Sequence, residues 1–244
     1  MARIWRAALM LCLASWSLAA FTNLEVSRNI DATSGVVRLE LVLVVAGNGP
    51  EYHLIFNESE GGRVHSLRAE TSRGALNVLR IEGRQTNASA GTLLLALDTS
   101  GENSQGFELR AVAILAGGAL KPVPGRLRQA EPQVAELRFS SHFSSPYPTL
   151  SDVTHVRLAS CNVLDYGPAA PPPASLDCNT AVYGPYAAST EAHSLALQFE
   201  HSSIPWLHAS SATRELSVLH WASSVDVSEH YDVRNVRWGS ECEC

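Results

Sequence analysis

The segment FSSPYPTLSDVTHVRLAS, residues Phe143–Ser160, holds the densest group of conformationally restricted residues in the chain. Pro146 and Pro148 each fix φ at about −65° and push the preceding residue toward extended geometry. Sequences typical of strands lie on both sides: Val134–Phe139 is apolar and β-prone, and Val153–Leu158 alternates between two faces. We therefore expect a rigid elbow that joins two strands.

Tyr147 lies between the two prolines of this elbow. Its side chain offers an aromatic face with a polar tip. Two interpretations are open: the elbow is an ordinary stiff turn of a β-sandwich, or it is a docking surface for a partner chain.

The composition indicates a folded, acidic protein. The chain has 244 residues, is 45% hydrophobic and 17% charged, and carries a formal net charge of −6. This length allows one large or two small domains with a sizeable core. Nucleic acid and anionic membrane surfaces require clustered Lys and Arg, and no basic stripe is present. We therefore expect neither as the main partner.

Residues 1–20 have the pattern of a secretory signal peptide. Arg3 and Arg6 precede the apolar run Ala7–Leu13, and small residues follow up to Ala19 and Ala20. The apolar run is too short for a retained membrane anchor, and no later run reaches the ~20 apolar residues of a spanning helix. We expect the mature chain to enter the secretory route without a transmembrane segment.

Most of the remaining chain alternates with period two, as strands do. Expected strands are Leu24–Ile30, Val37–Val45, Tyr52–Phe56, Leu76–Ile81, Thr92–Leu97, Phe107–Leu115, Leu195–Glu200, Glu215–Trp221 and Tyr231–Val236. A short helix over Glu70–Val78 is the one helical candidate. The predicted class is mainly β, an antiparallel β-sandwich-like domain with long loops.

The longest of these loops is expected over residues 165–190, which are rich in Pro, Gly and Tyr. It is either an arm that contacts a partner or an insertion without a function. Cys161 and Cys178 flank its proline-rich part, and in an oxidising compartment a disulfide between them would fix its base. Cys242 and Cys244, separated by one residue, are expected to pair with another chain or to stay free.

Two segments are acceptor sites for N-linked glycans. Asn57-Glu58-Ser59 and Asn87-Ala88-Ser89 each match Asn-x-Ser within a polar, turn-like segment. Glycans at Asn57 and Asn87 would mark outward-facing loops.

Motifs of catalysis and cofactor binding are missing from the sequence. It has no GxSxG, GxGxxG, P-loop or HExxH pattern, and five histidines between His193 and His230 lack metal-ligand spacing. Scattered acids leave a glycosidase-type pair of carboxylates as an alternative, to which no motif points. We expect no catalytic residue, no metal and no cofactor.

Four ordered blocks carry a resemblance to a known family. They are LEVSRNID at Leu24–Asp31, the elbow and its continuation at Phe143–Tyr166, YGPY at Tyr183–Tyr186, and RELSVLHW at Arg214–Trp221 followed by the acidic run Val225–Val233. The chain resembles the luminal part of ribophorin I, the first subunit of the oligosaccharyltransferase complex. Residues 46–130 match least well.

The resemblance implies a non-catalytic subunit of the complex that transfers a preassembled glycan from dolichyl diphosphate to Asn in Asn-x-Ser/Thr of nascent proteins. Its implied location is the luminal side of the endoplasmic reticulum, where family members are anchored in the membrane. Implied partners are the other subunits, including the catalytic one, and nascent polypeptides. Tyr147, Tyr183 and Tyr186 are the expected partner contacts.

The resemblance also divides the chain into three parts: a signal peptide over 1–20, a luminal β domain over 21–237 and a divergent tail over 238–244. Because family members continue further, the sequence is expected to be a shortened form. One alternative is a secreted carbohydrate- or protein-binding β module, with Trp206, Trp221 or Trp238 as stacking platforms. Another is a hydrolase.

Overall fold

Strands dominate the computed structural model, which describes residues 21–57, 60–83, 92–102, 105–116, 119–123, 132–166, 172–187, 194–201, 207–221 and 223–235. One short 3-10 helix, η1 (Gly61–Arg63), is the only helical element among these residues. The mainly β class expected from the alternating sequence is therefore confirmed.

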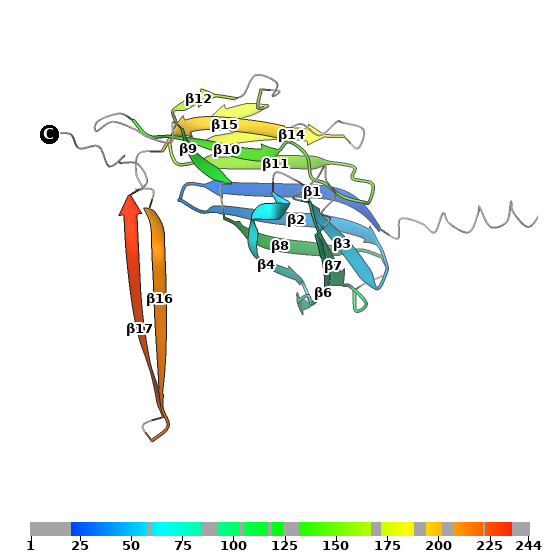
Figure 1. The fold of residues 1–244 in the computed structure, drawn as a ribbon. Coiled ribbons are helices and arrows are strands. Elements are labelled where there is room, and N and C mark those ends of the chain that lie inside the picture. Colours follow the sequence, from blue (N-terminus) through cyan, green and yellow to red (C-terminus); the bar gives the residue numbers. More distant parts are fainter. Residues whose placement is uncertain are drawn as a thin grey trace, which may run out of the picture.

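An eight-stranded sheet forms the centre of the fold (Figure 1). Its strands, in spatial order, are β13 (Ser175–Asp177), β14 (Thr180–Tyr186), β11 (Asp152–Leu158), β1 (Phe21–Ala32), β2 (Val37–Gly47), β8 (Phe107–Leu115), β4 (Val64–Thr71) and β5 (Gly74–Ala75). The bounds expected for Phe107–Leu115 agree with β8, because its alternation of apolar and polar residues is regular.

The large sheet is mixed, whereas an antiparallel one was expected. β1 runs parallel to β11, with Val26 opposite Asp152 and Ala32 opposite Leu158. Every other pairing of named strands in the described residues is antiparallel. A parallel pair needs a long connection, and here the chain between β1 and β11 builds most of the other strands first.

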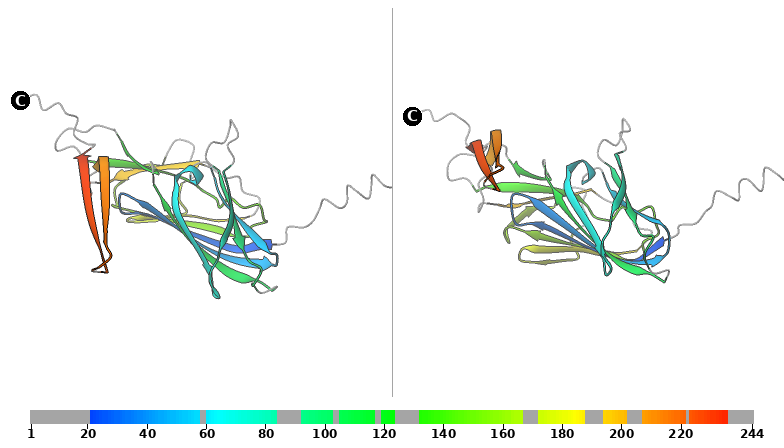
Figure 2. Two further views of the ribbon diagram at one scale, coloured as in Figure 1. Left: turned by 60° about the horizontal axis from the view of Figure 1, so that its bottom comes forward. Right: turned by 90° about the horizontal axis from the view of Figure 1, so that it is seen from below.

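Two smaller sheets cover one face of the large sheet (Figure 2). The four-stranded sheet has the order β12 (Val163–Asp165), β15 (Ser194–Glu200), β10 (Val134–Ser140), β9 (Leu120–Val123), and the three-stranded sheet has the order β3 (Glu51–Phe56), β7 (Leu93–Asp98), β6 (Val78–Gly83). Along β2 the buried residues alternate with half-buried or exposed ones. Only one face of the large sheet therefore contributes to the hydrophobic core, which includes residues of all three sheets.

The proline-rich elbow connects two of these layers. It follows β10 in the four-stranded sheet and precedes β11 in the large sheet. The expectation that it joins two strands is confirmed, and the two strands lie in different sheets. The elbow is thus a crossover between layers.

Two local predictions were wrong. The segment Glu70–Val78 is no helix: β4 turns back into β5 at Gly74, whose φ of 130° is unfavourable for other residues. The segment 165–190 is no continuous loop either, because β13 and β14 within it pair with each other and extend the edge of the large sheet. Main-chain pairing at a free sheet edge outweighed the local Pro and Gly content in this segment.

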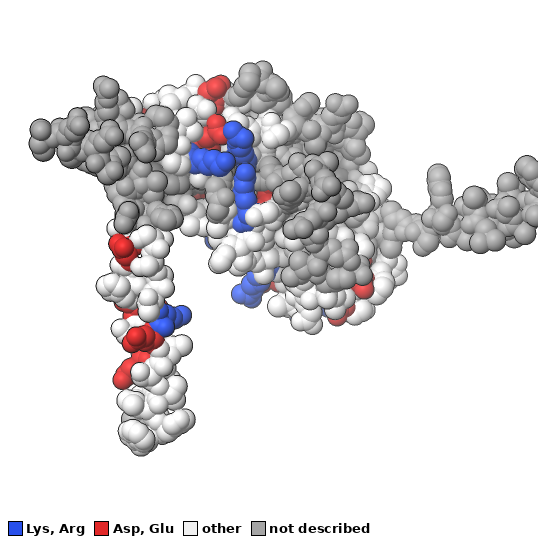
Figure 3. Space-filling view, viewed as in Figure 1, with Lys and Arg blue, Asp and Glu red and all other residues white. Residues whose placement is uncertain are grey.

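A long hairpin, β16 (Leu207–Leu219) and β17 (Ser224–Asn235), projects from the three sheets (Figure 1). One of its faces is largely apolar and exposed: Ala212 opposite Tyr231, Leu216 opposite Val227 and Val218 opposite Val225. An ion pair crosses this face, with 2.8 Å between Arg214 Nε and Glu229 Oε1. Charged side chains gather along the middle of the hairpin, away from its uncharged tip (Figure 3).

Within the described residues, no helix has the length and apolar character needed to cross a membrane. The predicted signal peptide over 1–20 and the tail over 238–244 lie outside these residues. The proposed division into three parts stays a prediction.

Candidate partner-binding site at the proline elbow

Asn23 fastens the elbow to β1. Its main chain accepts a hydrogen bond from the N–H of Leu150 (2.9 Å) and donates one to the carbonyl of Pro148 (2.8 Å). Its side-chain amide donates to Ser145 Oγ (2.9 Å) and Thr149 Oγ1 (3.0 Å). Asn23 is fully buried, so these bonds fix the elbow where water cannot replace them.

The side-chain oxygen of Asn23 extends this network to the three-stranded sheet. Tyr52 Oη donates a hydrogen bond to Asn23 Oδ1 over 2.8 Å. Burial, together with the nearby Tyr147, raises the pKa of Tyr52, although hydrogen bonds oppose the shift. Tyr52 therefore stays a neutral donor at physiological pH.

Tyr147 belongs to an aromatic cluster at the same place. Its ring centroid lies 5.4 Å from that of Phe21 and 4.9 Å from that of Tyr52, and the ring of His53 stacks on it at 6.4 Å. Tyr147 Oη accepts a hydrogen bond from the main-chain N–H of His53 over 2.9 Å. The half-buried ring thus ties the elbow to β3.

A groove of about 370 Å³ opens beside the elbow. It is lined by Ile55 of β3, by His142, Phe143, Ser144, Ser145, Tyr147, Pro148 and Thr149 of the elbow, by Asp152 of β11, and by Tyr186 and Ala187 at the end of β14. The His142 and Tyr186 rings stack with centroids 4.0 Å apart. Its volume lies within the range of ligand pockets, and its lining is both aromatic and polar.

Asp152 is the titratable carboxylate of this groove and is almost fully buried. Its Oδ2 accepts a hydrogen bond from the N–H of Phe143 over 2.6 Å, while its Oδ1 has no hydrogen-bond partner in the part of the chain that the structure describes. Burial raises the pKa of Asp152, and the charge of Arg28 and the Phe143 bond offset part of this rise. A ligand donor that reached this carboxylate would gain a strong bond.

A buried ion pair joins β1 to the segment after β3. Arg28, on β1, is 1% exposed and pairs with Glu60 beside η1. A second Arg28 nitrogen donates to the carbonyl of Ser140, at the end of β10, over 3.0 Å. Arg28 thereby connects the large sheet, the four-stranded sheet and the segment after β3, so its role is structural.

The three expected partner-contact tyrosines have different environments. Tyr147 and Tyr186 are half-buried and line the groove. Tyr183 is 0% exposed and packs edge-on against Phe139 with ring centroids 5.7 Å apart. Strand alternation places Tyr183 on the core face of β14, so its side chain does not reach the surface, and the expected partner contact through it stays a prediction. For Tyr147 and Tyr186 the expectation stays a prediction.

The remaining predicted sites lie away from the groove or outside the described residues. The structure joins Cys161 and Cys178 in a disulfide, with their Cα atoms 4.4 Å apart. Asn57 is partly exposed just after β3, whereas Asn87, Cys242, Cys244, Trp206 and Trp238 lie outside the described residues. Trp221, near the tip of the hairpin, is 88% exposed. Glycosylation of Asn57 and Asn87, and stacking of a sugar on the tryptophans, stay predictions.

Several residues that build the site were missed by sequence reasoning, above all Asn23, Asp152 and Arg28. The sequence gives a weak indication for Asn23, because Asn is depleted in strands and Asn23 lies in strand β1. Nothing local indicated that it would meet an elbow more than a hundred residues away in sequence.

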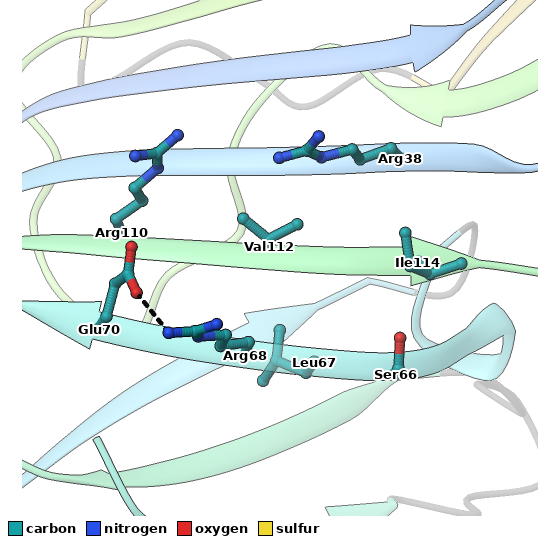
Figure 4. Close-up of a pocket in the computed structure, with 8 residues that line it drawn as sticks. All are labelled: Arg38, Ser66, Leu67, Arg68, Glu70, Arg110, Val112 and Ile114. Atoms are coloured by element: carbon teal, nitrogen blue, oxygen red, sulfur yellow. Dashed lines mark ion pairs between the residues drawn. The ribbon is translucent and has the colours of Figure 1, made fainter. Parts of the chain in front are cut away.

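A second hollow, of about 490 Å³, lies on the outer face of the large sheet (Figure 4). Arg38, Arg68 and Arg110 lie there on β2, β4 and β8. Their charges are compensated, because Arg38 and Arg110 both pair with Glu40 and Arg68 pairs with Glu70 over 3.3 Å. This open, compensated surface lacks the unpaired polar group seen in the elbow groove.

Within the described ranges, no group of three or more His, Cys, Asp or Glu side chains could hold a metal ion. The structure is that of a layered, mainly β protein, and the groove beside the elbow is its candidate site.

Comparison with known proteins identifies the family. A sequence model described as Ribophorin I matches residues 21–237, and the chain belongs to this family. It is 26% identical to dolichyl-diphosphooligosaccharide–protein glycosyltransferase subunit 1A of Arabidopsis thaliana, over 92% of this chain and 39% of the relative. It is 24% identical to subunit 1 of the same enzyme from Caenorhabditis elegans, over 92% of this chain and 38% of the relative.

The chain thus spans less than half the length of these relatives. Among solved structures, it is similar to Legionella pneumophila aminopeptidase A, with a TM-score of 0.40 and 12% identity over 90% of this chain and 25% of that one. It is also similar to native yeast LTA4 hydrolase, with a TM-score of 0.41 and 8% identity over 79% of this chain and 30% of that one. Such distant likeness carries no functional conclusion.

Proposed function

We propose that this chain is a non-catalytic subunit of the oligosaccharyltransferase complex. In this role it supports transfer of a preassembled glycan from dolichyl diphosphate to Asn in Asn-x-Ser/Thr of nascent proteins. The observation that carries the proposal is family membership over residues 21–237 together with relatives named as subunit 1 of this glycosyltransferase.

Sequence features agree with this assignment. The pattern of residues 1–20 is that of a secretory signal peptide, which would direct the chain to the endoplasmic reticulum, and the two Asn-x-Ser sites suit a luminal glycoprotein. The proposed location is the luminal side of that membrane. The proposed partners are the other subunits, including the catalytic one, and nascent polypeptides.

Within this role we assign the elbow to partner binding. The elbow is held by the buried bonds of Asn23 and by the main-chain bond to Tyr147, so its surface is preorganised. Preorganisation lowers the entropy lost on association. Tyr147 and Tyr186 supply aromatic contact area, of the kind enriched in interfaces.

Affinity purification from microsomes tests the assignment. The tagged full-length chain, expressed with its own N-terminus, should co-purify with the catalytic transferase subunit, detected by mass spectrometry. Tyr186→Ala should reduce this recovery more than Tyr166→Ala, a matched change of another half-buried tyrosine outside the groove. Recovery without any transferase subunit would refute the proposal.

A transfer assay tests the non-catalytic part separately. The purified chain is incubated with lipid-linked oligosaccharide and a peptide containing Asn-x-Thr, and glycopeptide is measured by mass spectrometry. We expect glycopeptide only when the intact complex is added. Product formed by the purified chain alone would show that it is an enzyme.

A further inference from the structure

The edge of β3 beside the elbow groove carries main-chain groups in position to pair with another strand. Among the described residues, β3 is an outer strand of the three-stranded sheet and pairs only with β7. The N–H of His53 points away from β7, because it bonds to Tyr147 Oη. Groups two residues apart in an antiparallel strand point to the same side, so the N–H and C=O of Ile55 also face away from β7.

Ile55 lines the groove, so this open edge forms one of its walls. Tyr147 Oη, at His53, occupies the position that a main-chain carbonyl of a neighbouring strand would take. The tyrosine therefore blocks the pairing of an added strand at His53 and sets one end of the edge that is available on β3. Beyond it, Ile55 provides a donor and an acceptor for an added chain.

The polar lining restricts the chemistry of the occupant. Among the described residues, one oxygen of the buried Asp152 carboxylate has no hydrogen-bond partner. Glu51 lies near Tyr147: burial is the main cause of the raised pKa of Tyr147, and the charge of Glu51 adds to it. No Lys or Arg is among the residues that line the groove. An acidic ligand is therefore disfavoured, and hydrogen-bond donors are favoured.

The aromatic rings favour a peptide over a sugar. Sugars bind by stacking on an open aromatic face, but the ring of Tyr186 is stacked by His142 and that of Tyr147 contacts Phe21, Tyr52 and His53. Main-chain groups of an open strand, in contrast, recognise any extended peptide.

We propose that the elbow groove binds an extended segment of another polypeptide, which adds as a strand to the edge of β3 at Ile55. The segment is uncharged or basic and places a hydroxyl or amide side chain toward Asp152. This inference names the partner chemistry of the elbow and so extends the proposed partner-binding role, but it is tested on the purified chain without any complex.

The test uses fluorescence anisotropy with a labelled peptide of alternating Val and Thr residues. Two derivatives are N-methylated, one at its odd and one at its even amides. Only one set of amides can face β3, so one derivative should bind about tenfold more weakly or worse, and the other should bind like the parent. A third peptide with Glu in place of Thr should also bind more weakly.

A protein variant provides the matching change on β3. Ile55→Pro removes the outward N–H, and proline is tolerated at an edge strand when its nitrogen faces away from the ladder. It should weaken binding about tenfold, while Ile55→Val should bind like the wild type. Circular dichroism and thermal melting check that both variants are folded. If Ile55→Pro does not fold, the comparison of the two N-methylated peptides on the wild type tests the inference.

Three results would overturn the inference. They are no binding of the parent peptide at millimolar concentration, equal binding of both N-methylated derivatives, and displacement of the peptide by chitooligosaccharide. Loss of co-purification with transferase subunits would leave peptide binding unchanged, so the two proposals fail independently.

Discussion

Asn23 is the residue on which the position of the elbow depends. It makes three side-chain and two main-chain hydrogen bonds while fully buried. Its side chain has a single acceptor oxygen and two N–H donors, and all of them are used. Substitution by an apolar residue removes one hydrogen-bond partner each from Tyr52 Oη, Ser145 Oγ and Thr149 Oγ1.

We predict that Asn23→Ala lowers the free energy of unfolding by about 3 kcal/mol, since buried polar groups left unsatisfied cost about 1–3 kcal/mol each. Urea unfolding followed by circular dichroism measures this change. Asn29→Ala, on the exposed face of the same strand, is the matched control and should change stability by less than about 0.5 kcal/mol. Equal effects of the two substitutions would show that the elbow is held by other contacts.

Asp152 makes stability depend on pH in an unusual direction for a carboxylate. Burial raises its pKa above the ordinary value of 3.8, and Arg28 only partly opposes this. The folded state then holds the proton more tightly than the unfolded state. The contribution of Asp152 to stability is therefore largest below pH 3.8 and is lost as the pH rises through the folded pKa.

We predict that the stability of the wild type relative to Asp152→Asn falls as the pH is raised from 3.5 to 7. Urea midpoints measured across about this range, where carboxylates titrate, give the difference. Asp31→Asn is the contrasting control. Burial raises the pKa of Asp31, but hydrogen bonds from Thr33 and the charges of Arg157 and Arg38 lower it overall, so the wild type should instead gain stability over Asp31→Asn with rising pH. A difference between wild type and Asp152→Asn that does not vary with pH contradicts the prediction.

At the scale of elements, the hairpin β16–β17 differs from every sheet of the core. Its two strands pair only with each other among the described residues, and its apolar face is exposed. Two-stranded sheets without a covering layer are marginally stable in water. Strands β2 and β8 have neighbours on both sides and bury one face.

We predict that amide hydrogens of the hairpin exchange roughly 100-fold faster than those of β2 and β8, because local opening needs far less free energy than global unfolding. Hydrogen exchange with mass spectrometry compares peptides covering Leu207–Leu219 and Val37–Gly47 in one sample. Exchange as slow in the hairpin as in β2 would mean that its apolar face is covered in solution.

The segment between β12 and β14 depends on a different restraint. The disulfide joins Cys161, just before β12, to Cys178, in the turn between β13 and β14. The sequence separation of 17 residues closes a loop whose restraint contributes about 3 kcal/mol in the chain-entropy account.

We predict that Cys161→Ser, Cys178→Ser and the double variant all lower the free energy of unfolding by about 3 kcal/mol, since each removes the same bond. Urea unfolding measures the loss, and peptide mapping without reductant identifies the bridge in the wild type. A wild type in which both thiols react with iodoacetamide before reduction would contradict the pairing.

At the scale of the whole molecule, the fold closes through contacts that are distant in sequence. β1 pairs with β11 in parallel, and the elbow before β11 returns to Asn23 of β1. The candidate groove is made where β3, the elbow and the end of β14 meet. It therefore exists only when the three-stranded sheet and the large sheet are assembled around the elbow.

Local sequence determined the central strands and the elbow. The alternation of Val37–Val45 and Phe107–Leu115 specified strands and their buried faces, because a one-residue shift would turn the buried apolar face outward. Two prolines around Tyr147 specified a rigid elbow, because they remove conformations whatever the surroundings. Four blocks of sequence indicated the family.

Only the tertiary structure decided the arrangement of these elements and the site. The parallel pairing of β1 with β11 joins residues more than a hundred positions apart, and so do the bonds from Asn23 to the elbow. The burial of Tyr183 depends on which face of β14 the neighbouring sheet covers. A period-two pattern predicts that one face of a strand is buried, but it does not predict which element covers that face. The groove, Asp152 within it and the open edge at Ile55 therefore followed from packing between sheets, which no local pattern specifies.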